Sequence, residues 1–364
     1  MNAIINKISI NGYKSFKDLK EFPLMSLNIL IGANGSGKSN FIEYFVFLKE
    51  IISKRMQFYV NKKGGADMHL YLGPKETEQI KSILDIGDYQ YRLILESTVD
   101  NRLVFNQELL EYQNQEAEFK SGHDESVLAS NSSKVVQTFY HFINRWTHYH
   151  FHDTCENSYI RRQHSIRDYE KLRPDGRNLA AFLYHLKNTD KDRYDLIRDT
   201  TQIAAPFFND FVLRPKLQSN GDEMIELEWA QKNTDYPFHP GQLSDGTLRF
   251  ISLATALLQK PSAPVMLFDE PELGLHPDAL IVLAGLFKQA SYHTQIIIAT
   301  QSATLLNNFD AENVVIINRN NGESMLSRLN EESLSEWLES YTLGELWQKN
   351  VFDEGSIHPP KIRL

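Results

Sequence analysis

The segment from Gly32 to Ser39, with the sequence GANGSGKS, constrains the fold of this chain more than any other feature. It fits the phosphate-binding loop pattern G-x-x-x-x-G-K-[ST] at every fixed position. Glycines in such a loop let the backbone wrap closely around phosphate groups and turn its N–H groups inward, at φ values that side chains resist. The pattern predicts that a run of residues binds nucleotide: Asn34, Gly35, Ser36, Gly37, Lys38, Ser39 and Asn40.

The sequence on both sides of this loop supports that interpretation. Leu27 to Ile31 (LNILI) is a short continuous apolar run, as expected for a buried parallel strand. Asn40 to Ser53 places apolar residues at helical spacing, so the unit is predicted to be strand, loop and helix. Lys38 would then neutralise the β and γ phosphates, and Ser39 would hold Mg²⁺. The alternative is a chance glycine-rich turn, which this context disfavours.

A second motif, far along the chain, carries two carboxylates. Val265 to Glu270 (VMLFDE) is four apolar residues followed by two acids, which predicts a buried strand with the acids at its tip. Asp269 is expected to bind Mg²⁺ through water, and Glu270 to orient and deprotonate an attacking water. Alone, the segment would also suit a polar turn after a strand; the phosphate loop upstream favours the paired interpretation.

The pattern of the remaining segments predicts an α/β fold. After residue 246, helical and strand patterns alternate, which indicates a mostly parallel sheet with its ligands at the carboxyl edge. Residues 56–111 show alternating segments separated by turn signals, which predicts an antiparallel β lobe. The expected C-terminal elements are a helix at about 247–258, a strand at 265–268, a helix at about 277–290, strands at 295–299 and 313–317, and an amphipathic helix within 334–351 that packs on the rest.

Length and composition bound the domain organisation and the compartment. The 364 residues suit one head built from residues 1–110 and 178–364, with a helical or mixed insertion at 111–177 whose first part, 113–134, is polar and irregular. The apolar share of 41% and the charged share of 23% exclude a disordered chain. A lone cysteine, Cys155, and the lack of any apolar run long enough to span a membrane predict a cytoplasmic protein with no membrane partner.

The predicted insertion is rich in histidine and arginine. His148, His150 and His152 alternate near Cys155, and we favour a plain surface strand over a metal site, because no second ligand cluster has familiar spacing. A formal net charge of −9 excludes a generally basic nucleic-acid-binding surface. Two interpretations of the local arginines stay open, a solvated face or a surface for nucleic acid or another partner: Arg161, Arg162, Arg167, Arg173 and Arg177.

A third motif, Gln242 to Thr247 (QLSDGT), precedes a helical pattern, so Ser244 is expected to be a helix N-cap. LSDGT also resembles the signature of ABC-type ATPases, in the form found in the RecF-like, SMC-related group. The phosphate loop and three further segments resemble elements of that group: NGYKSF at 11–16, FDEPELGLHP at 268–277 and QIIIATQS at 295–302. YHFHDT, GRNLAAFLYHL and TLGELWQKN resemble segments of stand-alone bacterial ATPases of the AAA family that are related to RecF.

The resemblance implies a P-loop NTPase head of the ABC/RecF type that binds ATP and Mg²⁺. It implies that Lys14 contacts nucleotide and that Ser244, Asp245 and Gly246 cap the γ-phosphate held by a second copy, so that ATP joins two heads. Gln301 stands at the switch position, where many members have a histidine; glutamine donates a hydrogen bond but carries no charge. Glu270 and Gln301 are therefore the expected catalytic pair. No glutamine between residues 56 and 80 is assigned to the loop that couples nucleotide to the insertion.

The favoured function is an ATPase that engages a second copy and drives a separate effector, such as a nuclease. The resemblance implies a role in bacterial DNA repair or anti-phage defence. Two alternatives from other classes remain: a nucleotide-gated scaffold with incidental hydrolysis, which the uncharged Gln301 favours, and a DNA-binding clamp, which the arginines of the insertion favour.

Overall fold

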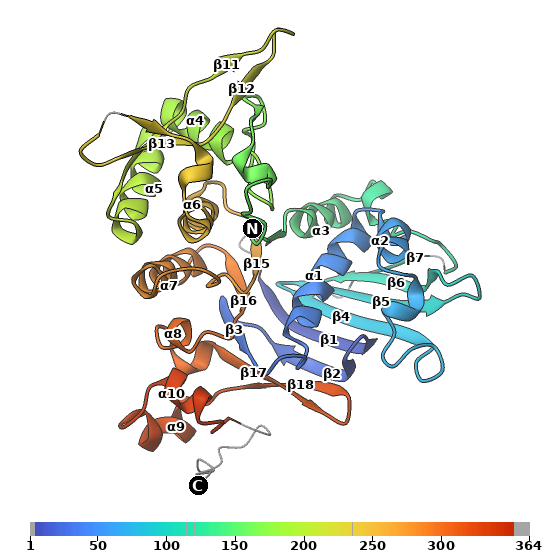
Figure 1. Ribbon diagram of the computed structural model, residues 1–364. Helices are drawn as coiled ribbons and strands as arrows, with labels where there is room; N and C mark the ends of the chain where they lie inside the picture. The colour runs from blue at the N-terminus through green and yellow to red at the C-terminus, as the bar shows by residue number, and fades with distance from the viewer. Residues whose placement is uncertain (1–3, 114, 120, 235, 353–364) are drawn as a thin grey trace.

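A mostly parallel six-stranded sheet forms the centre of the molecule (Figure 1). The computed structural model describes residues 4–113, 115–119, 121–234 and 236–352. In spatial order the strands of this sheet are β18 (Glu323–Arg328), β17 (Val314–Asn320), β3 (Leu27–Ile31), β16 (Gln295–Ala299), β15 (Val265–Asp269) and β8 (Thr147–Tyr149). Every neighbouring pair is parallel except β17 with β18. The predicted mostly parallel sheet is therefore confirmed.

A second six-stranded sheet, wholly antiparallel, lies beside the first (Figure 1). Its order is β2 (Phe16–Pro23), β1 (Ile5–Tyr13), β4 (Gln79–Ile86), β5 (Tyr89–Ser97), β6 (Leu103–Tyr112) and β7 (Gln115–Phe119). Burial alternates along β5, as expected for a strand with one covered face. The predicted antiparallel lobe is confirmed, with β2 and β7 at the two edges of its sheet. Residues 56–68 begin it with helical turns instead of strands, α2 (Met56–Lys62) and a 3₁₀ turn at Ala66–Met68.

Helix α1 (Lys38–Ile52) packs between the two sheets and belongs to the same apolar core as both. The parallel strands are buried on both faces, so alternate residues of one strand enter different cores. Ile297 of β16 faces the core that contains α1, whereas Ile296 and Ile298 face the core covered by the other helices. This two-sided burial explains why the strands have continuous apolar sequences rather than alternating ones.

The second face of the parallel sheet is covered by helices that follow the insertion (Figure 1). The remaining helices are α3 (Lys134–Asn144), α4 (Leu179–Thr189), α5 (Lys191–Ala204), α6 (Asp245–Leu258), α7 (Pro277–Ser291), α8 (Ala303–Leu306), α9 (Glu331–Leu338) and α10 (Leu343–Gln348). Two small antiparallel sheets complete this side: β10 (Phe208–Val212), β13 (Glu228–Gln231) and β14 (Pro237–Phe238); and β11 (Lys216–Leu217), β12 (Glu223–Ile225) and β9 (His164–Ser165).

Residues 111–177 contribute to both large sheets. The stretch predicted as an irregular excursion contains β7, which pairs with β6, and β8 then pairs in parallel with β15. Between them, α3 packs against the core of α1 through Phe139 and Ile143. The boundaries at residues 110 and 177 stay a prediction.

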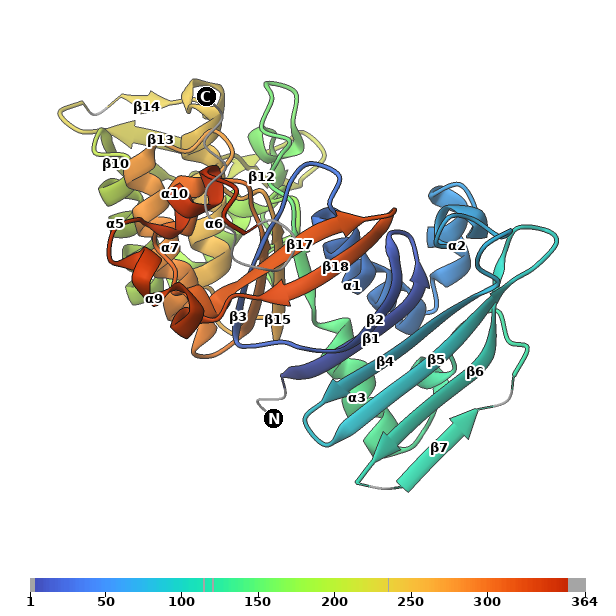
Figure 2. The same cartoon turned by 90° about the horizontal axis from the view of Figure 1, so that it is seen from below.

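The C-terminal part of the described chain folds back onto the head as two short helices, α9 and α10, rather than one. Trp337 and Trp347 pack against the core that covers the parallel sheet, so the predicted packing is confirmed. The hairpin of β17 and β18 reaches the antiparallel sheet, where β18 lies beside β2 (Figure 2). None of the helices within the described residues is long and apolar enough to cross a membrane.

Candidate functional site

The predicted phosphate loop connects β3 to α1 at the carboxyl edge of the parallel sheet. Gly35 and Gly37 have φ of 77° and 117°, in the left-handed region that only glycine enters readily. A Cβ at Gly37 would lie 2.2 Å from Oγ of Ser324, so even an alanine would not fit there. The loop therefore needs Gly37 for both conformation and space, and Gly35 for conformation.

The C-terminal hairpin holds the outside of this loop, a feature that sequence reasoning missed. Ser324 of β18 donates through Oγ to the carbonyl of Ser36 at 2.5 Å, and its own N–H donates to the carbonyl of Ser15 at 2.7 Å. Arg319 of β17 donates to the carbonyl of Gly35 at 3.3 Å. No motif marks these contacts, because they join residues that are almost three hundred positions apart.

Lys38 is buried beneath the loop and binds its backbone. Its Nζ donates to the carbonyls of Gly32 at 2.7 Å and Ala33 at 3.0 Å. Burial lowers the pKa of Lys38, and the nearby carboxylates of Glu270, Asp269 and Glu272 oppose that effect. The loop's single cation therefore lies opposite the acids at and just after the end of β15, two strands away from β3 in the sheet.

Asp269, the last residue of β15, lies close to Ser39. Burial raises the pKa of Asp269, while interaction with the Ser39 hydroxyl lowers it. Its Oδ1 is buried and has no hydrogen-bond partner among the described residues. An unpaired buried carboxylate oxygen beside a hydroxyl suits a hard cation such as Mg²⁺, which takes oxygen ligands and keeps several waters.

Glu270 follows Asp269 with a φ of 45°, an unfavourable backbone for a side chain this large. Its N–H donates to the carbonyl of Ala299 at 2.8 Å, which anchors it to the end of β16. Nε2 of Gln301 donates to Oε1 of Glu270 at 2.7 Å, so the two predicted catalytic side chains are in direct contact. Strained backbone that the surroundings hold in place is typical of functional sites.

Glu272 is a site residue that sequence reasoning overlooked. Its Oε1 accepts from the hydroxyl of Thr300 at 2.6 Å and from the backbone N–H of Gln301 at 3.0 Å. Burial raises the pKa of Glu272. The carboxylate thus fixes the turn that aims Gln301 at Glu270. The third acid of the segment DEPE was the available signal.

The signature residues lie at the N-terminus of α6. Ser244 is the predicted N-cap, and its Oγ accepts from the N–H of Thr247 at 3.1 Å. Asp245 is the first helical residue, with 62% of its side chain exposed. A Cβ at Gly246 would lie 2.1 Å from the carbonyl oxygen of Gly274, so this glycine allows α6 to pack on the loop that follows β15.

The other two predicted nucleotide contacts differ in position. Asn40 donates to Oγ of Ser15 at 2.9 Å and stays beside the loop. The ammonium of Lys14 instead pairs with Glu43 on α1. Burial alone would raise the pKa of Glu43, but hydrogen bonds from Lys14 and Lys63 lower it to about 2. The Lys14 charge is therefore already paired, and its nucleotide contact stays a prediction.

The arginines of the insertion do not form one basic surface. Arg161 is 6% exposed and binds backbone carbonyls and Asp245, so it fits neither of the two interpretations left open, a solvated face or a partner-binding surface: a buried, fully engaged guanidinium cannot reach a phosphate backbone. Arg173 pairs with Asp168, and Arg177 with Asp175. Arg162 and Arg167 stay exposed.

The histidines of the same segment do not suggest a metal site. In the described part of the chain, no group of three or more His, Cys, Asp or Glu side chains is placed to hold a metal ion. Burial, with His150 and His152 nearby, lowers the pKa of His148 to about 4. Neutral packing in a strand therefore accounts for this residue.

Fold and site together define a P-loop head: a glycine loop with its lysine after one parallel strand, and carboxylates at the tip of another. The chain belongs to the family described as "AAA domain, putative AbiEii toxin, Type IV TA system", whose model matches residues 27–307, more than half of its length. It is thus an AAA-family P-loop ATPase domain. A comparison with curated proteins found no match.

Solved Smc heads share the fold. An Smc head bound to the C-winged helix domain of ScpA has a TM-score of 0.57 and 19% identity, over 90% of this chain and 98% of the other. An Smc head domain with an extended coiled coil bound to the C-terminal domain of ScpA, derived from Pyrococcus furiosus, has a TM-score of 0.57 and 18% identity, over 93% and 99%. At such identities the likeness establishes the head fold alone.

Proposed function

We propose that this chain binds ATP and Mg²⁺, hydrolyses ATP, and uses ATP to engage a second copy of itself. The observation that carries the proposal is the contact between Glu270 and Gln301, opposite the buried ammonium of Lys38. A carboxylate oriented by a neutral amide, next to a phosphate-binding loop, suits a base that positions water for attack on a phosphate.

In this proposal the loop residues from Asn34 to Asn40 surround the phosphates. Ser39 and Asp269 hold Mg²⁺, which neutralises phosphate charge when bound. Gln301 keeps the Glu270 carboxylate in one rotamer, with Oε2 free to accept a proton from water. Because the amide carries no charge, we expect turnover to be slow.

The signature residues Ser244, Asp245 and Gly246 are proposed to act on the nucleotide of the second copy. The N-terminus of α6 presents unpaired N–H groups and the positive end of the helix dipole, which favour an anion. Ser244 already serves as the N-cap, and one end can serve both purposes. Two heads would therefore be joined by two nucleotides.

The decisive experiment is Glu270→Gln, with phosphate release and light scattering as readouts. We expect turnover to fall by at least about a hundredfold and an ATP-bound dimer to accumulate. Gln301→Asn is the companion variant. It keeps an amide group, but its shorter side chain removes the contact of that group with Glu270. Unchanged phosphate release in Glu270→Gln would remove Glu270 from its role and favour the nucleotide-gated scaffold.

We further propose that the head drives a separate effector, such as a nuclease, in anti-phage defence or DNA repair. The toxin–antitoxin wording of the family description and the ScpA domains bound to the solved Smc heads support a role with partners. Co-purification of the Glu270→Gln protein with and without ATP tests this role. Recovery of no ATP-dependent partner from the native host would contradict it.

The DNA-clamp alternative now rests on Arg162 and Arg167, the two exposed arginines of the predicted set that form no ion pair with an acid within the described residues. It predicts DNA affinity that falls steeply with salt and that weakens when both residues are changed to alanine. DNA affinity that is absent at low salt, or unaltered in the double variant, would leave the ATPase proposal as it stands.

A further inference from the structure

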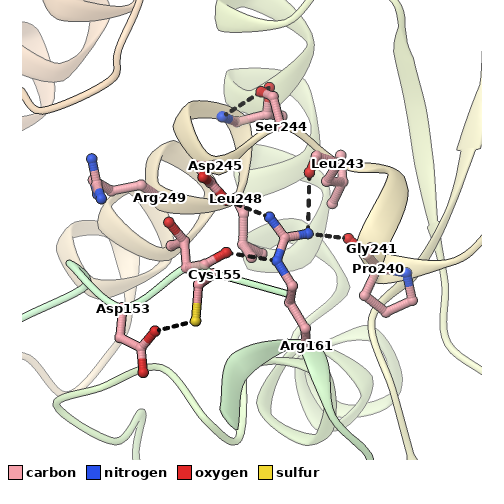
Figure 3. A network of polar contacts seen from close by, with 12 residues as sticks. Asp153, Cys155, Arg161, Pro240, Gly241, Leu243, Ser244, Asp245, Leu248 and Arg249 are labelled. Atoms are coloured by element: carbon pink, nitrogen blue, oxygen red, sulfur yellow. Dashed lines mark hydrogen bonds and ion pairs between the residues drawn. The ribbon is translucent and has the colours of Figure 1, made fainter. Parts of the chain in front are cut away.

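Two buried arginines, Arg161 and Arg249, fasten residues 151–154, which follow β8, to the signature at the start of α6. Figure 3 shows both side chains and the contacts of Arg161. Arg161 precedes β9 and is 6% exposed; Arg249 lies in α6 and is 8% exposed. Their hydrogen bonds go mainly to backbone carbonyls, so the two guanidinium groups join loops, and Arg161 also pairs with one acid, Asp245.

Arg161 connects three separate pieces of chain. Its Nε donates to the carbonyl of Thr154 at 2.7 Å. Its Nη1 donates to the carbonyl of Leu243 at 3.1 Å and also to that of Pro240. Its Nη2 donates to Oδ1 of Asp245 at 2.7 Å (Figure 3). One side chain therefore sets the position of the residues on both sides of Ser244.

Arg249 makes the matching connection from within α6. Its Nε donates to the carbonyl of Phe151 at 3.0 Å and its Nη2 to that of His152 at 3.2 Å. Its Nη1 donates to the carbonyl of Leu273, in the loop after the acidic motif. The same segment is thus held from two directions by two fixed charges.

This segment also borders the acids of the candidate site. Phe151 and His152 line one narrow recess together with Asp269, Glu270 and Arg249. β8, which leads into the segment, pairs with β15 so that Tyr149 lies opposite Phe268. Any ligand beside Asp269 therefore meets a segment whose carbonyls are bound by Arg161 and Arg249.

A buried guanidinium stays charged, and its desolvation is offset only while its acceptors are in place. Arg161 spans Thr154 and Asp245 with a planar fork of donors, which a lysine cannot reproduce. The network therefore favours one discrete arrangement of the two loops over a range of intermediate ones.

We propose that Arg161 is a positioning residue that couples the nucleotide site of its own head to the signature offered to the other head. This coupling role rests on the ATP-dependent dimer proposed above. By holding the signature loop against residues 151–154, Arg161 presents Ser244 and Gly246 in the geometry that meets the second copy's nucleotide. Arg249 supports the same segment from within α6.

The test compares Arg161→Lys and Arg161→Ala in the Glu270→Gln parent, with Arg214→Lys as a matched control. Arg214 forms an ion pair with Glu228, and 58% of its side chain is exposed. The control therefore keeps the positive charge and replaces a guanidinium group at the surface. Dimerisation is measured by light scattering over a range of protein concentrations with saturating ATP. Affinity for a fluorescent ATP analogue is measured at concentrations where the heads are monomeric.

We expect the dimer dissociation constant to rise about tenfold in Arg161→Ala and at least about threefold in Arg161→Lys, with monomer ATP affinity changed less than about twofold. The control should dimerise as the parent does. If Arg161 acted in folding alone, its replacement would lower the melting temperature or the ATP affinity together with dimerisation. Arg161→Lys keeps the charge and most of the side-chain volume, so it can still be measured if the alanine variant unfolds.

Three outcomes would overturn the inference, and they are distinguishable. A parent that stays monomeric with ATP would refute the head dimer and this coupling with it. A parent that dimerises, with an Arg161→Lys derivative that dimerises equally well, would refute the coupling alone. Equal loss of monomer ATP binding and dimerisation in both Arg161 variants would also contradict it.

Discussion

The side-chain amide of Gln301 donates to Oε1 of Glu270 at 2.7 Å, joining the ends of the neighbouring strands β16 and β15. Glu272 binds the backbone N–H of the same glutamine and holds it in place. The amide thus restricts the orientation of the Glu270 carboxylate without changing its charge, which is what the proposed general base requires.

Removing this amide should slow hydrolysis without affecting binding. In Gln301→Ala we expect phosphate release to fall by about tenfold to a hundredfold, because Glu270 loses its orientation, while ATP affinity stays within about twofold. In Gln301→Glu a carboxylate replaces the amide donor and repels Glu270, so we expect phosphate release to fall at least as far as in Gln301→Ala. Initial rates of phosphate release measure both effects. Full activity in Gln301→Ala would show that Glu270 needs no positioning.

Replacing Lys38 should act mainly on ATP binding rather than on the hydrolysis step. In Lys38→Met, which keeps the length of the buried chain but removes its charge, we expect ATP affinity to fall by at least about a hundredfold. Equilibrium titration with a fluorescent ATP analogue measures this. Lys14→Met is the informative companion: since Lys14 is paired with Glu43, its loss should lower ATP affinity far less. An equal loss in both variants would place Lys14 at the nucleotide after all.

Two helical glycines should respond to alanine in opposite ways. In Gly246→Ala the new Cβ would approach the Gly274 carbonyl to 2.1 Å, so we expect a loss of about 2 kcal/mol in unfolding free energy. Gly285 of α7 has nothing within 4 Å of a built Cβ, and Gly285→Ala should stabilise the protein by up to about 1 kcal/mol. Urea unfolding measures both changes. Equal gains would mean that α6 can move away from the loop after β15.

The buried His69 should make stability depend on pH. It is fully buried beside the rings of Tyr13, Phe47 and Tyr59, and neither of its ring nitrogens has a partner in the described part of the chain. Burial, with Lys14 nearby, lowers the pKa of His69 from 6.5 to about 4. Between those values the unfolded chain binds a proton that the folded chain excludes, so stability is fully present above pH 6.5 and is lost as pH falls toward 4.

The pKa difference of His69 between the unfolded and the folded chain corresponds to about 3 kcal/mol of unfolding free energy. His69→Phe removes the titrating group but keeps a ring, so we expect the total loss of unfolding free energy between pH 6.5 and 4 to decrease by about that amount. His148, whose pKa is also lowered to about 4, remains in the variant and keeps part of the slope. Urea unfolding at several pH values measures it. An unaltered slope would mean that His69 is protonated in the folded protein.

The sequence by itself determined the parts of this protein that depend on neighbouring residues. GANGSGKS after an apolar run requires a loop between strand and helix, because its glycines and its lysine have fixed spacing and the run is too short for a helix. The strand ending in Asp269 and Glu270, and the N-cap at Ser244, follow from equally local chemistry. These elements appear in the structure within a few residues of their predicted limits.

Only the tertiary structure decided which distant groups meet. Arg161 looked like a surface charge, since nothing near it in sequence shows that the carbonyls of Pro240 and Leu243 surround it. The contacts of Ser324 with Ser36, and of Gln301 with Glu270, likewise join strands whose order is set by topology. Local spacing fixes which atoms a segment offers, whereas burial and strand order decide which partners they find, and these arise from the packing of the whole chain.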